Sequence, residues 1–164
     1  MEKVREFLGN GDTDVIWEDY DVVVWVDWRE EDEAIIRYCE DILKTGTLLS
    51  EYQDADNKLG YVLYIHYNNK KTIVPFNPDN VSRDTTLIAL NQVLNPDYEV
   101  RLWIDSIGGD TLAFVPLSSA QWSELEKEFG TEKVQYHFSK INAQSKMFEL
   151  SMEEVRKIMK EHGL

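Results

Sequence analysis

The sequence has little cysteine, proline or glycine, and it has no long apolar run. It contains 1 Cys, 4 Pro and 8 Gly among 164 residues. A lone cysteine, Cys39, excludes an internal disulfide, and this usage favours a reducing, cytoplasmic compartment. The apolar run 22–26 is far shorter than the roughly 20 residues of a membrane span, and no apolar stretch follows residues 1–6. We therefore expect neither a signal peptide nor a membrane-spanning helix.

The chain nevertheless has the size and composition of a folded protein. Hydrophobic residues make up 43% of it and aromatic residues 12%. A chain of this length buries a sufficient core without disulfides or metal ions. With no internal repeat and no linker rich in Pro, Gly or Ser, the sequence predicts a single domain over residues 1–164.

Basic residues are scarce, and the resulting negative charge is unevenly distributed. The formal net charge is -14, from 31 acidic and 17 basic residues. Residues 12–56 hold 15 acidic and 3 basic residues, a net charge of -12, whereas residues 57–164 hold 14 and 12, a net charge of -2. A negative field repels nucleic acid and anionic lipid and attracts cations. We therefore expect a basic protein partner, with no direct binding to nucleic acid or membrane.

The order of the elements predicts an α+β fold. Apolar positions at helical spacing, together with capping residues, predict helices at residues 2–8, 31–45, 84–94, 118–129, 131–141 and from 151 onward. Alternating apolar residues predict strands at 20–28 and 98–105, and strand-like runs next to turn residues predict strands at 61–67, 71–76 and 111–117. Residues 61–76 and 98–117 are each expected to form a hairpin. This pattern indicates an antiparallel or mixed sheet of about five strands covered by helices, with a helical C-terminal third.

Particular residues are expected to begin or end the helices. Ser118 with Gln121 fits a capping box, and Ser151 with Glu154 repeats the pattern. Thr131 is predicted to cap the helix that follows it, and Gly46 is placed to end the helix at 31–45. In the strand at 20–28, alternation predicts that Val22, Val24, Val26 and Trp28 share one face.

No residue pattern specifies catalysis, a metal site or a cofactor. The segment 103–110 offers Ser106 between carboxylates, but a nucleophile elbow needs glycine where Ile104 stands. Its glycines instead favour an ordinary hairpin turn. Cys39 lies on the apolar stripe of its helix, which favours a small buried side chain. The histidines lack a second ligand at metal-binding spacing, and no glycine-rich phosphate loop is present.

What remains is the segment 12–56, in which tryptophan and tyrosine alternate with acids. One interpretation is a solvated surface that keeps the protein soluble. The other is a binding face, because exposed aromatic residues anchor interfaces and complementary charge selects partners. The binding interpretation gives these candidate partner-binding residues: Asp12, Asp14, Trp17, Glu18, Asp19, Asp21, Trp25, Asp27, Trp28, Glu30, Glu31 and Asp32.

In its length and in the acidic, tryptophan-containing stretch 12–56, the chain resembles the immunity proteins of bacterial toxin systems. That resemblance is one of profile and matches no diagnostic motif. It implies one-to-one inhibition of a toxin domain, in which acidic groups occupy a basic cleft, and it implies no catalysis by this chain.

Two alternatives belong to other functional classes. The acidic face would also suit a mimic of nucleic acid that blocks a DNA- or RNA-binding protein. Alternatively, a small-ligand site or an enzymatic site would occupy a pocket between sheet and helices, lined by His66, Arg101 and Asp105.

Overall fold

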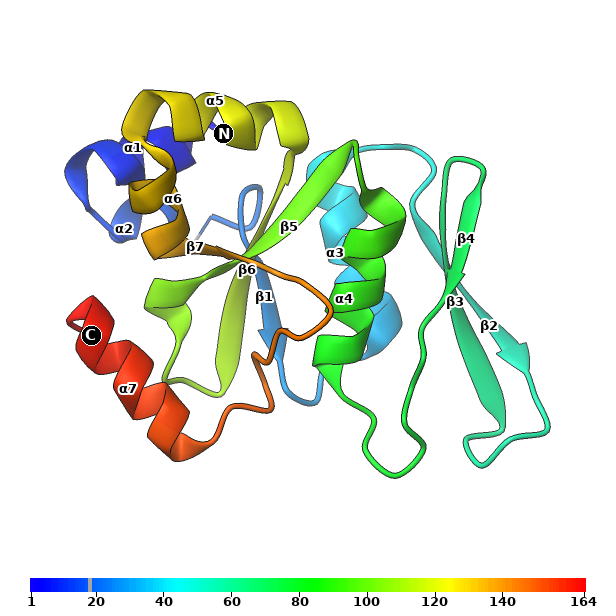
Figure 1. Ribbon diagram of the computed structural model, residues 1–164. Helices are drawn as coiled ribbons and strands as arrows, with labels where there is room; N and C mark the ends of the chain where they lie inside the picture. Colours follow the sequence, from blue (N-terminus) through cyan, green and yellow to red (C-terminus); the bar gives the residue numbers. More distant parts are fainter. Residues whose placement is uncertain (18) are drawn as a thin grey trace.

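The chain contains both helices and short strands, interspersed along the sequence (Figure 1). The computed structural model describes residues 1–17 and 19–164. Its helices are α1 (Glu2–Asn10), α2 (Asp14–Trp17), α3 (Asp32–Leu43), α4 (Arg83–Leu94), α5 (Ser119–Phe129), α6 (Thr131–His137) and α7 (Met152–His162), with a 3-10 turn η1 (Ile104–Ser106). Its strands are β1 (Val24–Asp27), β2 (Leu49–Asp54), β3 (Tyr61–Tyr67), β4 (Lys70–Ile73), β5 (Tyr98–Trp103), β6 (Thr111–Ser118) and β7 (Phe138–Lys140). The α+β class is thereby confirmed.

The strands form two antiparallel sheets rather than the expected single sheet of about five strands. Sheet A has the order β1-β6-β5-β7, and sheet B has the order β2-β3-β4. Helices α3 and α4 lie between the two sheets, and α1, α5 and α6 cover the far side of sheet A (Figure 1). Helix α7 lies beside the lower end of this assembly, away from sheet B. No helix in the described part of the chain is long and apolar enough to cross a membrane.

Sheet A separates two hydrophobic cores. Because successive side chains of a strand point to opposite faces, β5 directs Val100 and Leu102 into one core and Trp103 into the other. The first core joins sheet A, α3, α4 and the inner face of sheet B, with Leu63 and Ile65 from β3. The second core packs sheet A against α1, α5 and α6. Each face of sheet A is therefore buried, and its accessible parts are its edges.

Both predicted capping boxes are present. The Ser118 hydroxyl accepts a hydrogen bond from the Gln121 amide at 3.1 Å, and the Gln121 side chain accepts from the Ser118 amide at 2.9 Å. Ser151 and Glu154 make the equivalent pair at 3.3 and 2.7 Å. Each box satisfies two amides that the helix itself leaves unpaired.

The strand predicted at 20–28 is shorter in the structure. The amides of Val22 and Val23 donate to the Asp19 carbonyl at 3.0 and 2.9 Å, so a turn precedes β1. As a result Val22 joins the second core instead of sharing a face with Val24. Trp28 lies beyond the end of β1 and is 55% exposed. β1 is therefore only 4 residues long.

Several other boundaries are corrected. Lys44, with φ of 52°, takes the left-handed position that ends α3, so Gly46 is not the cap. Helix α6 begins after Gly130 without a side-chain cap from Thr131. The predicted helix at 131–141 stops at His137, because the next residues pair with β5 as strand β7. Strand β2 was not predicted, and the C-terminal third contains β6 and β7 besides its helices.

Candidate functional site

The free edge of β1 lies at the centre of the acidic segment. β1 is the terminal strand of sheet A and pairs with β6 along one side. In the described chain no strand pairs with its other side. Alternate residues of such a strand direct their N–H and C=O groups away from the sheet, where they are able to pair with another chain.

A hollow of about 340 Å³ lies over this edge, and we call it the β1-edge groove. Its lining consists of Tyr20, Val23, Val24, Trp25, Glu30, Tyr38, Asp41 and Ile42. Val24 belongs to the first core and Trp25 packs against the second. Val23 and Val24 are only 1% and 2% exposed, so the accessible lining along β1 comes mainly from Trp25, and the groove lies beside this strand.

Aromatic side chains form much of the groove. Trp25 is held by a hydrogen bond from its Nε1 to the Trp17 carbonyl at 3.2 Å and by an edge-to-face contact with the Trp17 ring, with centroids 5.0 Å apart. Tyr20 is 74% exposed. On α3, Tyr38 has the Arg37 guanidinium 5.3 Å from its ring centroid. An anchored indole loses little conformational entropy when a partner packs on it.

The charge of the groove is negative. Glu30 and Asp41 line it, and among the described residues no lysine, arginine or histidine does. A second hollow shares Tyr20 with the groove and a third shares Glu30, so both are neighbours of the groove along the acidic segment. The other acids that line these two neighbouring hollows are Asp14, Asp19, Asp21, Glu31, Asp32 and Glu33.

Each cation that lines the two neighbouring hollows contacts another side chain of the protein, through an ion pair or an aromatic ring. Lys3 forms an ion pair with Asp19, and this hydrogen bond is the main cause of the lowered pKa of Asp19. Arg83 pairs with Asp32. Arg29 lies over the Trp28 ring, 4.5 Å from its centroid. The ion pairs of the described residues do not include the other carboxylates of the three hollows.

Two candidate residues, Asp19 and Asp32, are paired with cations of the same chain. Asp32 is only 5% exposed; its carboxylate lies 3.0 Å from Arg83 Nη2 and accepts a hydrogen bond from the Thr86 hydroxyl. Burial raises the pKa of Asp32, while Thr86 and Arg83 act in the opposite direction. Asp32 and Asp19 thus join parts of the fold to each other.

The other candidates are distributed along the same surface. Trp25 and Glu30 line the groove itself, whereas Asp14, Asp21 and Glu31 line the adjoining hollows. Three of the remaining candidates lie outside the hollows or support them: Asp12 accepts from the Asp14 amide, Asp27 accepts from the Arg29 amide, and Trp17 packs against Trp25. Trp28 lines a different hollow, beside Met152 of α7. Glu18 lies outside the described residues.

Six groove residues were missing from the predicted set: three on α3, together with Tyr20, Val23 and Val24. Tyr38, Asp41 and Ile42 are spaced three and four residues apart, so they share one helix face. That spacing was the available signal. It became informative only once α3 was known to pack beside the free edge of β1.

The predicted shared pocket of His66, Arg101 and Asp105 is wrong. His66 Nε2 lies 2.6 Å from Glu51 Oε2 on sheet B. Asp105 Oδ2 lies 3.0 Å from His137 Nδ1, where η1 meets α6. Arg101 lies in sheet A, on the face opposite α3 and α4. The three side chains therefore belong to separate parts of the fold.

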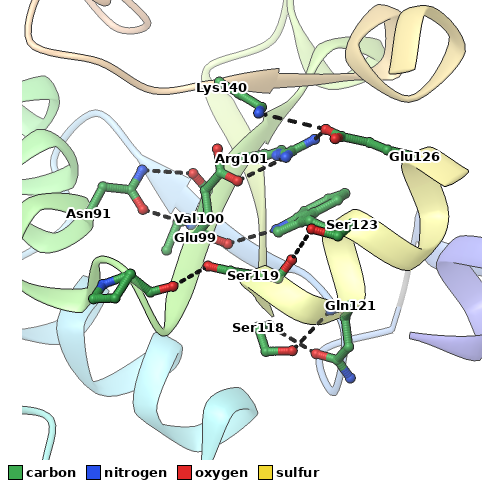
Figure 2. A network of polar contacts seen from close by, with 12 residues as sticks. Asn91, Glu99, Val100, Arg101, Ser118, Ser119, Gln121, Ser123, Glu126 and Lys140 are labelled. Atoms are coloured by element: carbon green, nitrogen blue, oxygen red, sulfur yellow. Dashed lines mark hydrogen bonds and ion pairs between the residues drawn. The ribbon is translucent and has the colours of Figure 1, made fainter. Parts of the chain in front are cut away.

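Arg101 is the centre of a buried ion-pair network (Figure 2). Its guanidinium is 1% exposed and lies 4.2 Å from the Trp122 ring centroid. Its two terminal nitrogens each lie 2.8 Å from a carboxylate, that of Glu99 and that of Glu126, and Lys140 approaches Glu126 at 3.7 Å. A hollow of about 490 Å³ adjoins this network and is lined in part by Glu99 and Lys140. The two positive charges of the network, on Arg101 and Lys140, balance the two negative charges on Glu99 and Glu126, which is typical of a structural network.

Cys39 is fully buried, and burial raises the pKa of its thiol to about 12. A thiol in that state is not a nucleophile at neutral pH. In residues 1–17 and 19–164, no three His, Cys, Asp or Glu side chains are grouped as metal ligands would be.

Comparison with protein-family models, curated proteins and solved structures returns no match. Function is therefore inferred from the residues of this chain.

Proposed function

We propose that this chain is a non-catalytic, cytoplasmic binding protein that neutralises a basic toxin domain by direct contact. The observation that carries the proposal is the β1-edge groove, which combines aromatic side chains with Glu30 and Asp41 and has no cation in its described lining. Groups of this kind are suited to a cationic surface, since aromatic residues supply contact area and the carboxylates supply charge complementarity.

The location of the charge also supports a binding role. Surface acids that are paired internally have little left to offer a partner, whereas the groove acids have no described basic neighbour in the lining. An excess of negative charge at residues 12–56 accelerates encounter with a positive partner over distances of about 10 Å at moderate salt. A toxin that binds nucleic acid presents such a positive cleft, and an acidic cover would block it.

The decisive experiment measures binding to a candidate toxin, chosen as any basic toxin-like protein encoded next to the gene for this chain, in a catalytically inactive form. Calorimetric titration is expected to give a one-to-one complex that weakens as salt is raised. The double reversal Glu30→Lys with Asp41→Lys is expected to weaken it about hundredfold, because two attractive contacts become repulsive.

A matched control is the pair Glu132→Lys and Glu153→Lys, which changes the charge equally on the exposed surfaces of α6 and α7. This pair is expected to change affinity by no more than about threefold through the long-range field. Equal losses in both double variants would show that net charge, not the groove, drives binding. Unchanged affinity in the groove variant would refute the proposal.

Competition with duplex DNA separates this function from nucleic-acid mimicry. If the complex blocks the toxin's nucleic-acid cleft, added DNA displaces this chain from its partner. Binding that is insensitive to DNA but sensitive to Glu30 and Asp41 indicates a site outside that cleft. Both results are compatible with neutralisation, and they assign different mechanisms to it.

A further inference from the structure

We propose that the β1-edge groove accepts an extended basic segment of the partner, which adds to sheet A as a new strand beside β1. One Arg or Lys side chain of that segment would occupy the groove. This inference rests on the proposed function and specifies how the partner is recognised.

The backbone of β1 provides the first step. Turns enclose β1 at both ends: the Val23 amide donates to the Asp19 carbonyl at 2.9 Å, and the Glu30 amide donates to the Asp27 carbonyl at 2.9 Å. Between them, β1 pairs with β6 along one side, and the opposite side has no strand partner in the described chain. This open stretch suits a short extended peptide, because main-chain hydrogen bonds supply affinity whatever its sequence.

The side chains above that edge provide the second step. An added strand directs alternate side chains to opposite faces, so one of its side chains would lie in the groove beside Trp25. A long cationic side chain has an apolar stem that suits the partly exposed Ile42, and a charged end that suits the exposed Asp41. Tyr38 and Trp25 add ring faces, which attract cations.

The charge of the edge decides between possible occupants. A second copy of this chain would bring its own Glu30 and Asp41 against the same groups, and that repulsion disfavours pairing of two β1 edges. An apolar strand would cover these carboxylates without neutralising them, which costs free energy. A basic segment supplies a backbone partner for the unpaired side of β1 and a positive charge for Glu30 and Asp41.

The test uses the full chain labelled with ¹⁵N and a defined probe, the peptide acetyl-Thr-Val-Arg-Val-Thr-amide. Titration is expected to shift the amide signals of residues 24–26 and the Trp25 indole signal, and to slow hydrogen exchange at the outward amides of β1. Replacing the arginine by citrulline keeps its shape but removes its charge, and we expect at least about tenfold weaker binding. The variant Asp41→Asn should have a similar effect, whereas Glu132→Gln on α6 should have none.

N-methylation of the peptide tests the added strand directly. Methyl groups on the amides that face β1 should abolish binding, whereas methyl groups on the alternate amides should be tolerated. Equal binding by both methylated peptides, or by the citrulline peptide, would contradict this inference, and so would peptide-induced shifts confined to other surfaces.

The toxin titration keeps the two proposals distinguishable. If toxin binding still depends on Glu30 and Asp41 while no peptide reaches β1, strand addition is wrong and the binding function stands. If toxin binding ignores those residues, the binding function itself fails, whatever the peptide does.

Discussion

The carboxylates of the β1-edge groove and those around Arg101 contrast two uses of the same chemical group. Glu99 and Glu126 are partly buried and each lies 2.8 Å from the Arg101 guanidinium. Glu30 and Asp41 lie at an open edge with no cation among the described lining residues. An acid that meets a cation inside the fold stabilises the fold, and an acid left without one at a surface is available to a partner.

Solvation explains why the two arrangements are stable in their own places. Arg101 is cut off from water on the face of Trp122, so its charge requires compensation nearby, and two carboxylates supply it. Glu30 and Asp41 remain hydrated, so no internal partner is needed. The comparison predicts different results for mutation in the two regions. Mutation of Arg101 should lower stability, whereas mutation of the groove acids should weaken binding to the partner.

The largest effect is expected for Arg101→Met. Removing the guanidinium leaves Glu99 and Glu126 close together and partly desolvated, with Lys140 3.7 Å from Glu126 as partial compensation. We expect a loss of about 3–5 kcal/mol in the free energy of unfolding, measured by urea denaturation. The triple variant Arg101→Met, Glu99→Gln and Glu126→Gln should recover much of this loss, because it removes the uncompensated charges.

The groove is the control for that experiment. Glu30→Gln with Asp41→Asn should change the free energy of unfolding by less than about 0.5 kcal/mol, as for surface positions in general. A large loss there would mean that the groove acids are structural, and the contrast between the two regions would disappear.

A smaller effect is expected for Asp32→Ala, which tests a candidate residue that the structure reassigns. The change leaves Arg83 without its carboxylate, although Arg83 also donates to the Glu30 carbonyl and is less buried than Arg101. We expect a loss of about 2 kcal/mol in unfolding free energy. Binding to the candidate toxin, measured well below the unfolding midpoint, should stay within about threefold of the wild type, because Asp32 faces Thr86 and Arg83. Normal stability with weakened binding would restore Asp32 to the binding face.

The sequence predicted correctly the elements that depend on contacts between residues close together in the chain. The boxes at Ser118 and Ser151 involve residues three positions apart, and β5 alternates apolar with polar residues before the glycine turn that leads to β6, so both could be read directly. Strand β2 is polar and exposed along most of its length and is a strand only because it pairs with β3. Strand β7 likewise depends on β5, and this long-range pairing overrides the helical pattern that continues to residue 141.

The candidate site divides in the same way. The composition of residues 12–56 located the acidic surface, including Trp25 and Glu30. It could not separate the internally paired Asp32 from the unpaired Glu30, since that depends on Arg83, more than 50 positions away. It also could not show that α3 adds Tyr38 and Asp41 to the edge of β1. Contacts between distant segments determine which acids remain free.

The smallest effect is expected at Glu51, an exposed acid whose partners lie on sheet B. Hydrogen bonds from Gln53, Lys71 and His66, in that order of importance, lower the pKa of Glu51 from 4.5 to about 2. The folded state therefore favours the ionised form, and the resulting stabilisation is present above pH 4.5 and is lost as the pH falls toward 2. In urea titrations, Glu51→Gln should lower the unfolding midpoint slightly at pH 7, and the gap from the wild type should narrow between pH 4.5 and 3. Glu132→Gln, on the exposed surface of α6, provides the comparison. A difference in unfolding midpoint that stays constant with pH would mean that the pairs of Glu51 with Lys71 and His66 contribute through packing rather than charge. In that case an ion pair would stabilise this protein only where water is excluded, as at Arg101.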